Sequence, residues 1–131
     1  MDDIFTSDGL AAWQGHLTHS PDFADAAHGW SGTLLLREIA AGGDARRVWI
    51  SLDNGELLDL RIGSEVDETT AEFVLAAEPQ TWRGLVDGSR DLAKAAFTGE
   101  LRLERGSVLR LLPRARAAAA LLRAARRDPA A

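Results

Sequence analysis

Residues 33–62 read TLLLREIAAGGDARRVWISLDNGELLDLRI, and this stretch decides the fold. Thr33 to Ile39 has the composition of a strand. Its run Leu34-Leu35-Leu36 has no polar face, which is typical of a central strand that is covered on both sides. Gly42-Gly43-Asp44 then predicts a turn into a second strand.

The next two strands alternate in polarity. From Arg47 to Leu52, the apolar side chains Val48, Ile50 and Leu52 share one face, and Trp49 lies on the other. Asn54-Gly55 is a strong signal for a two-residue hairpin turn. The apolar face of the third strand comprises Leu58, Leu60 and Ile62. The stretch therefore predicts an antiparallel meander of three strands.

Helices are predicted before this meander. Ser7-Asp8 can cap a first helix that runs to about Leu17. The apolar spacing in that helix is three and four residues, so it is expected to bury Leu10, Trp13 and Leu17. Ser20-Pro21 begins a second helix, because proline suits the first helical position, and Gly29 ends it.

After the meander, strands and helices alternate. Ala71 to Ala77 is a fourth strand, and Glu78-Pro79 opens a short helix that contains Trp82 and Leu85. Ser89 can cap a second short helix, which Gly99 closes and whose apolar residues are Leu92, Ala96 and Phe97. Leu101 and Leu103 lie in a fifth strand, and helical sequence resumes at Ser107 with a kink at Pro113. This order predicts an α+β fold whose helices pack largely on one face of a sheet.

The length and composition limit the possible classes of protein. A chain of 131 residues fits one domain. We expect helical sequence over 7–28, the sheet and its covering helices over 31–104, and a C-terminal helix over 107–127. The sequence has no cysteine, which excludes disulfides, zinc–thiolate sites and cysteine nucleophiles. No segment has the roughly 18 apolar residues of a membrane span, and the acidic start is unlike a signal peptide, so a cytoplasmic location is expected.

Charge is distributed unevenly along the chain. The net charge of −5 combines −11 over residues 1–100 with +6 over residues 101–131. In the last helix, Arg116, Arg123 and Arg127 share one stripe, and a second, apolar stripe comprises Ala118, Leu121, Leu122 and Ala125. A packed amphipathic helix is favoured over an arm that binds nucleic acid, because the body is acidic and its strands lack exposed aromatic pairs.

Signatures of catalysis are missing. There is no glycine-rich phosphate loop and no nucleophile elbow, and the acidic pairs fall in turns, where solvated carboxylates are usual. His16 and His19 could bind a metal with Asp22 or Asp25, but surface histidines are favoured, because no zinc-protease pattern accompanies them. We therefore expect no catalytic residue, no metal site, no cofactor and no nucleic-acid partner.

Three stretches resemble the sterol carrier protein type-2 domain, a family of non-specific lipid-transfer proteins. The first runs from His28 to Leu36 with its glycines and tryptophan; the second is Phe73-Val74-Leu75 followed by residues 79–88; the third is Ala93 to Leu103. The order of elements also agrees over about residues 9–126. Two departures are the turn Glu104-Arg105-Gly106-Ser107, where the family often has Gly-Asp, and the absence of a peroxisomal C-terminal signal, which favours a bacterial protein.

The resemblance implies a five-stranded mixed sheet, formed by the meander and two further strands and covered by helices. It also implies an apolar cavity between sheet and helices for a fatty acid, acyl-CoA, sterol or isoprenoid, and no enzymatic activity. The candidate ligand-binding side chains are Trp49, Phe73, Leu75, Trp82, Leu85, Phe97, Leu111, Leu112 and Leu122. Each of these side chains can equally be plain core.

The leading hypothesis is a lipid carrier, and the basic stripe Arg116, Arg123 and Arg127 is expected to contact anionic membranes or an acidic head group. The alternative is an interaction module with a filled core that forms a homodimer or supports a partner enzyme.

Overall fold

The protein is described here by a computed structural model that covers residues 4–39 and 45–125. The expected turn at Gly42-Gly43-Asp44 and the expected arginine Arg127 lie outside the described residues. The strands form one mixed sheet in the order β3-β2-β1-β4-β5, which confirms the expected five-stranded architecture. The strands are β1 (Gly32–Glu38), β2 (Arg47–Asp53), β3 (Glu56–Ile62), β4 (Phe73–Ala77) and β5 (Leu101–Arg105).

Strand β1 lies at the centre of the sheet, as its uninterrupted leucines predict. It pairs antiparallel with β2 and parallel with β4, so that Leu34 lies opposite both Ile50 and Phe73. Leu34, Leu35 and Leu36 are all buried, since both faces of the strand are covered. Asn54 and Gly55 both have positive φ, of 51° and 83°, which is the geometry of the expected tight hairpin between β2 and β3.

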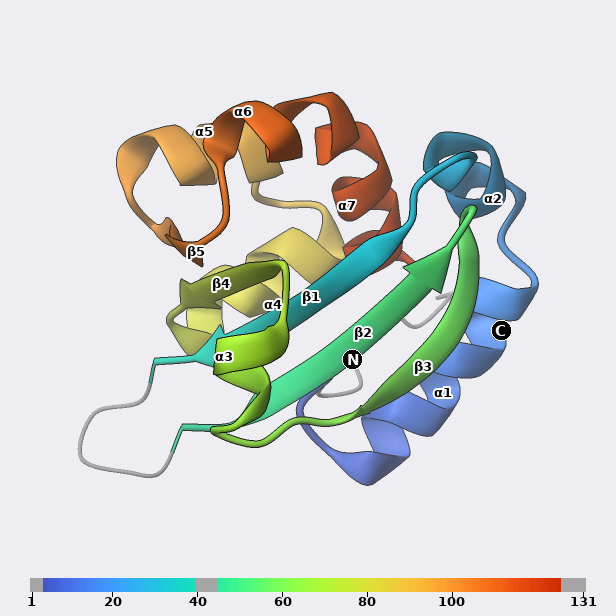
Figure 1. Ribbon diagram of the computed structural model, residues 1–131, viewed down its shortest axis with the longest axis horizontal. Helices are drawn as coiled ribbons and strands as arrows, with labels where there is room; N and C mark the ends of the chain where they lie inside the picture. Colours follow the sequence, from blue (N-terminus) through green and yellow to red (C-terminus); the bar gives the residue numbers. More distant parts are fainter. Residues whose placement is uncertain (1–3, 40–44, 126–131) are drawn as a thin grey trace.

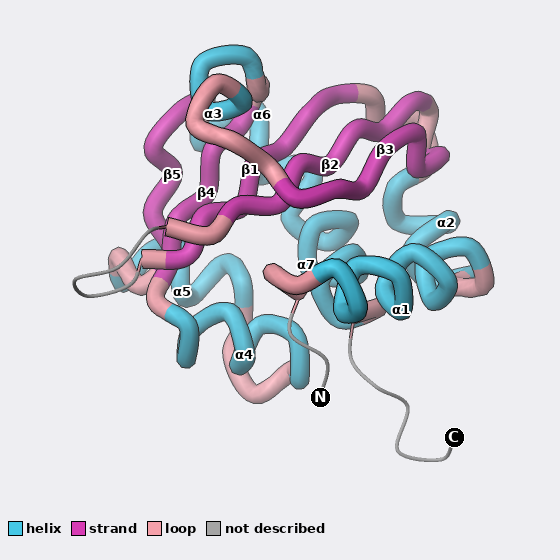
Figure 2. Tube along the Cα trace, turned by 90° about the horizontal axis from the view of Figure 1, so that it is seen from below, coloured by secondary structure: helices cyan, strands magenta, loops and turns pink. Residues whose placement is uncertain are grey.

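The helices are concentrated on one side of the sheet. They are α1 (Ser7–Thr18), α2 (Pro21–Ala27), α3 (Asp67–Thr70), α4 (Pro79–Asp87), α5 (Leu92–Thr98), α6 (Val108–Leu111), the 3₁₀ helix η1 (Leu112–Arg114) and α7 (Ala115–Arg123). Helices α1, α2, α4, α5 and α7 lie against one face, and α3 lies on the other (Figure 2). The main apolar core therefore lies between the sheet and these five helices (Figure 1).

Helix α1 buries Leu10, Trp13 and Leu17, as the spacing predicts. Its cap is Thr6 rather than Ser7, because the Thr6 hydroxyl accepts a hydrogen bond of 3.0 Å from the Gly9 N–H. Ser20 caps α2 as expected and accepts from the Phe23 N–H at 3.2 Å.

The third strand differs from its predicted pattern. Leu60 is buried, but Leu58 is 63% exposed and Ile62 is 45% exposed. A bulge between Ser51 and Leu52 shifts the register, so that Leu52 pairs with Leu57 and Leu57 packs against the core in place of Leu58. Ile62 is the last residue of β3, which is an edge strand of the sheet among the described residues.

Helix α5 also differs from the prediction. It begins after Asp91, whose carboxylate accepts from the Lys94 N–H at 2.9 Å, so the expected cap Ser89 is wrong. Ser89 instead belongs to the turn after α4, where its N–H donates to the Asp87 carboxylate at 2.7 Å. Helix α5 consequently buries Leu92 and Ala95, three residues apart, and leaves Phe97 82% exposed.

The C-terminal segment is divided at Pro113, as predicted. Helix α6 gives way to η1 and then to α7, because proline has no N–H for a continuous helix. The buried stripe of this last segment comprises Ala117, Ala118, Leu121, Leu122 and Ala125. This agrees with the amphipathic helix expected there.

Helix α1 holds the C-terminal end of α7. The indole N–H of Trp13 donates to the Leu121 carbonyl at 2.8 Å, and this bond is buried. One turn further along α1, His16 Nδ1 donates to the Ala124 carbonyl at 2.9 Å. The last carbonyls of a helix lack partners within the helix, so both side chains serve as caps for α7.

Candidate functional site

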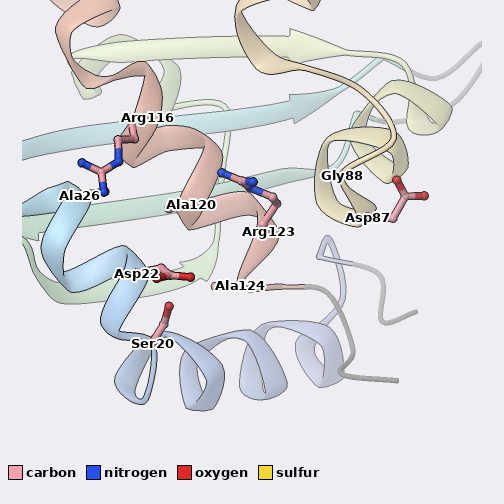
Figure 3. A pocket seen from close by; sticks show the side chains of 9 residues that line it. All are labelled: Ser20, Asp22, Ala26, Asp87, Gly88, Arg116, Ala120, Arg123 and Ala124. Carbon is pink, nitrogen blue, oxygen red and sulfur yellow. The ribbon is translucent and has the colours of Figure 1, made fainter. Parts of the chain in front are cut away.

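A groove runs along α7 where it meets α2 and the end of α4 (Figure 3). Its volume is about 630 Å³ and it is open to solvent. Its charged side chains are Asp22 at the start of α2, Asp87 at the end of α4, and Arg116 and Arg123 on α7. The remaining lining residues are Ser20, Ala26, Gly88, Ala120 and Ala124.

A second groove, of about 290 Å³, shares Gly88 and Arg123 with the first. It lies between α7 and the segment that joins α4 to α5. Its apolar lining comprises the buried side chains Leu85, Leu92 and Leu122 and the half-buried Ala119. Its polar lining comprises Ser89, Arg90, Asp91 and Arg123. This groove is therefore lined by apolar side chains of the core together with charged side chains.

Arg123 is the cation common to both grooves. Its Nε–H donates only a long bond of 3.4 Å to the Ala119 carbonyl, and it forms no ion pair within residues 4–39 and 45–125. Arg116, two turns earlier on α7, pairs with Asp25 at 3.2 Å, and both side chains are about three-quarters exposed. In Figure 3 the guanidinium of Arg123 projects from α7 while the Asp87 carboxylate points away from it. Arg123 is thus placed to receive an anionic group from solvent.

Gly88 shapes the boundary between the two grooves. It ends α4 with a φ of 87°, a left-handed conformation that glycine adopts without strain. A side chain there would come within 4.0 Å of the Arg123 Cδ atom. That distance is an ordinary van der Waals contact, so the backbone conformation at the end of α4, and not space for Arg123, favours glycine here.

Six of the nine predicted side chains lie in the main core between sheet and helices. They are Phe73, Leu75, Trp82, Leu85, Leu111 and Leu122. Of these, Leu85 and Leu122 also line the second groove. Trp82 is held by the protein itself, because its indole N–H donates to the Arg37 carbonyl at 3.0 Å and its ring meets Phe5 edge to face.

The other three predicted side chains are not brought to this region. Trp49 lies on the opposite face of the sheet, where it packs with Leu35, Ala71 and Val74 and has the Arg61 guanidinium 5.1 Å from its ring. Phe97 is 82% exposed on α5, because the helix buries Leu92 and Ala95 instead. Leu112 is 45% exposed at the start of η1.

The opposite face of the sheet carries ion pairs that attach α3. Glu68 binds Arg37 at 2.7 Å and Arg47 at 2.9 Å. Asp67 binds Arg61 at 2.9 Å and accepts from the Ser64 N–H at 2.8 Å. The Arg61 hydrogen bonds, followed by those from Ser64, hold the pKa of the Asp67 carboxyl below its ordinary value. Every carboxylate in this network is paired, so the network has a structural role.

Two of the three histidines serve as hydrogen-bonding groups. His16 caps α7, and His19 Nδ1 donates to the Gly15 carbonyl in its own helix at 3.0 Å. In the described part of the chain, no three histidine or acidic side chains come together in a way that could hold a metal ion. The described residues also include no helix long and apolar enough to cross a membrane.

Sequence reasoning identified part of this region. Arg116 and Arg123 were expected on one stripe of α7, and Leu85 and Leu122 were candidate ligand contacts. It did not identify the lining by Ser20, Ala26 and Gly88, because their only local signals are those of a helix cap, a helix interior and a turn. Only the packing of α2 and α4 against α7 brings these three together.

Comparison with known proteins supports the fold and the family. The SCP-2 sterol transfer family matches residues 14–105. A crystal structure of sterol carrier protein 2 superposes with a TM-score of 0.80 at 27% identity, covering 95% of this chain and 98% of that one. A conserved hypothetical protein from Thermus thermophilus gives 0.77 at 27% identity, covering 96% and 91%.

A more distant fold match is the Aedes aegypti sterol carrier protein 2 in complex with the C16 fatty acid palmitate. It gives a TM-score of 0.56 at 17% identity, covering 91% of this chain and 98% of that one. Comparison with curated proteins gives no match.

Proposed function

Because the chain belongs to the SCP-2 sterol transfer family, we propose that it is a non-catalytic carrier for a fatty acyl, sterol-like or isoprenoid ligand. The observation that carries this proposal is the second groove, whose lining includes Leu85, Leu92 and Leu122 beside Arg123. Such a site combines an apolar surface for a chain with a cation for an acidic head group. The palmitate complex of the Aedes aegypti protein supports a fatty acid as the first ligand to test.

Affinity in such a groove would come mainly from burial of the chain. Each buried methylene stabilises the complex by about 0.8 kcal/mol. Arg123 would add a charge-assisted hydrogen bond to a carboxylate or phosphate at the groove edge. Selectivity among chains of similar length would be low, since one methylene more or less changes the binding free energy by only about 0.8 kcal/mol.

A long chain needs more room than the open groove supplies. The volume of about 290 Å³ is at the small end for a ligand pocket. The core side chains Phe73, Leu75 and Trp82 belong to the same apolar cluster as Leu85 and Leu122, which line the groove. We propose that the chain enters along α7, whose alanines give a smooth surface against α4, and displaces part of this core contact.

The direct experiment is native mass spectrometry of the purified protein, followed by titration with a fluorescent fatty acid read through energy transfer from tryptophan. A matched pair of substitutions on α7 identifies the groove. Ala119 lines the second groove and Ala120 lines the first, and both are half-buried. Ala119→Phe should weaken binding by about tenfold or more, since it excludes at least two methylenes. Ala120→Phe should change binding by less than about threefold.

The proposal would be overturned if no lipid copurified and no added fatty acid bound. Equal effects of the two phenylalanine substitutions would mean that the ligand does not bind in the second groove.

A membrane contact through Arg116 and Arg123, with Arg127 further along the chain, is part of the same proposal. It predicts that glutamine at these positions weakens binding to anionic vesicles.

One observation favours the alternative, an interaction module with a filled core. Trp82 is already fully engaged by the Arg37 carbonyl and by Phe5, as expected of an ordinary core residue. In that case the protein would bind no lipid and would form a dimer. Light scattering of the lipid-free protein measures this directly.

A further inference from the structure

Helix α6 and the residue that follows it expose a cluster of large apolar side chains. Leu109 is 81% exposed, Val108 is 55% exposed and Leu112 is 45% exposed. Helix α6 lies at the margin of the molecule, ahead of α7 (Figure 1). Single exposed leucines are common, but a local cluster on so short a segment marks a surface for interaction.

The spacing of this cluster places it on one side of the turn. Positions 108, 109 and 112 are one and four residues apart, so they point the same way along a helical turn. Leu111, between them, faces inward and is buried in the main core. The segment is therefore held to the body by Leu111 while its apolar side faces out.

Arginines alternate with these apolar side chains along the segment, at positions 110 and 114. Arg110 is 74% exposed and comes no closer than 4.0 Å to its partner Glu72. Arg114 donates a long bond of 3.4 Å to the Gly29 carbonyl. Residues 106–125 contain four arginines and no acidic residue, whereas residues 1–100 carry a net charge of −11. The segment thus combines exposed apolar side chains with arginines and contains no acidic residue of its own.

We propose that Val108, Leu109 and Leu112 insert into the interfacial layer of an anionic lipid bilayer, with Arg110 and Arg114 on the lipid phosphates. Apolar side chains flanked by arginines are the composition of interfacial membrane elements, in which guanidinium groups remain at head-group level. A second copy of the chain fits less well. A symmetric contact would bring the same arginines of both copies together and cost electrostatic repulsion.

This docking surface goes beyond the proposed ligand site, and its test needs no bound ligand. It comprises α6 and η1, whereas the two grooves lie along α7. Pro113 interrupts the backbone hydrogen bonding between the two segments. Membrane contact through α6 would leave the grooves of α7 accessible for exchange with the bilayer.

The experiment is cosedimentation of the full chain with vesicles of phosphatidylcholine and phosphatidylglycerol, compared with vesicles of phosphatidylcholine alone. Leu109→Ser should weaken partitioning onto the anionic vesicles by roughly tenfold, which corresponds to the loss of one inserted leucine side chain. Leu58→Ser is the matched control, because Leu58 is 63% exposed but lies on β3. It should partition like the unaltered protein.

Charge is tested by a second matched pair. Arg110→Gln together with Arg114→Gln should weaken anionic binding and flatten its dependence on salt. Arg102→Gln, on β5, removes an exposed arginine elsewhere and should have little effect. These substitutions are at exposed or half-exposed positions, so circular dichroism and fatty-acid titration should remain unchanged. Those controls separate failure of docking from failure of the carrier function.

Three results would overturn the proposal. The first is equal binding of Leu109→Ser and Leu58→Ser to anionic vesicles. The second is equal binding of the unaltered protein to both vesicle types, or to neither. The third is a dimer that Leu109→Ser dissociates without any vesicle binding, which would assign the surface to a contact between copies of the chain.

Discussion

Replacing Trp13 by phenylalanine tests the attachment of α1 to α7. The Trp13 indole N–H is the buried donor to the Leu121 carbonyl, at 2.8 Å. That carbonyl lies in the last turn of α7, where the Ala125 N–H bonds to Leu122 and not to Leu121. The Trp13→Phe variant would therefore leave the buried Leu121 carbonyl oxygen without a donor among the residues that the structure describes.

Two effects set the magnitude. An unsatisfied buried acceptor costs about 1–3 kcal/mol. The smaller ring also leaves a void around a fully buried side chain, and a partial truncation of this kind costs about 1–2 kcal/mol. The free energy of unfolding should fall by about 2–5 kcal/mol, a large part of the roughly 5–15 kcal/mol typical of a domain.

Trp30→Phe separates the two effects. Trp30 is only 3% exposed, and its indole makes no side-chain hydrogen bond with any residue that the structure describes. The Trp30→Phe variant should therefore lower the free energy of unfolding only by the cost of lost packing. Urea unfolding followed by far-ultraviolet circular dichroism measures both variants without relying on tryptophan emission. If Trp13→Phe and Trp30→Phe agreed within about 0.5 kcal/mol, the reasoning about the Leu121 carbonyl would be wrong.

Two further predictions concern stability. Asp67→Asn should cost about 1 kcal/mol near neutral pH, because Arg61 is partly exposed and the bond is screened. Since the pKa of Asp67 is lowered in the fold, its stabilisation is present above the unfolded pKa and is lost as pH falls through the folded pKa. Urea titrations across the acid range should therefore show a smaller loss of stability for the variant than for the unaltered protein. Gly106→Ala should be strongly destabilising, because φ is +102° and a Cβ would lie 2.5 Å from the Phe73 ring, whereas Gly15→Ala should raise stability by about 0.5–1 kcal/mol in open space on α1. Thermal unfolding of the two alanine variants should give shifts of opposite sign.

Local signals predicted much of the sheet. The leucine run of β1 specified a central strand because no register could place a polar face toward solvent. Asn54-Gly55 specified a tight turn because both positions adopt positive φ readily. These features depend on a few neighbouring residues, and the structure confirms them.

Features that depend on distant contacts were not predictable. Leu57 replaces Leu58 in the core because of a bulge opposite Ser51, and no local pattern marks such an extra residue. The start of α5 depends on whether Ser89 or Asp91 caps it, and both are good capping residues. Phe97 was an expected ligand contact but lies on the surface, because α5 packs the face that carries Leu92 and Ala95, and that choice of face depends on contacts with other elements.

The sequence predicted which kinds of side chain lie near the grooves, but not which individual side chains line them. The amphipathic stripes of α7 indicated which side of the helix packs and which carries arginine. Whether an apolar side chain lines a groove or fills the core depends on how closely two helices approach, and the sequence does not encode that distance locally. Leu85 and Leu75 look alike in the sequence, yet of the two only Leu85 lines one of the grooves along α7.

The parallel pairing of β1 with β4 has a consequence for how the chain reaches this fold. The meander of β1, β2 and β3 joins neighbours in sequence and can form early, but β4 pairs with β1 only after a long loop closes. The Glu72 N–H donates to the Thr33 hydroxyl at 2.9 Å, and these two residues are 39 positions apart in the sequence. Until then, one edge of β1 is a row of unpaired backbone groups flanked by three leucines, which favours pairing between chains. Refolding yield should therefore fall steeply with protein concentration, and a tethered peptide spanning β4 should restore it.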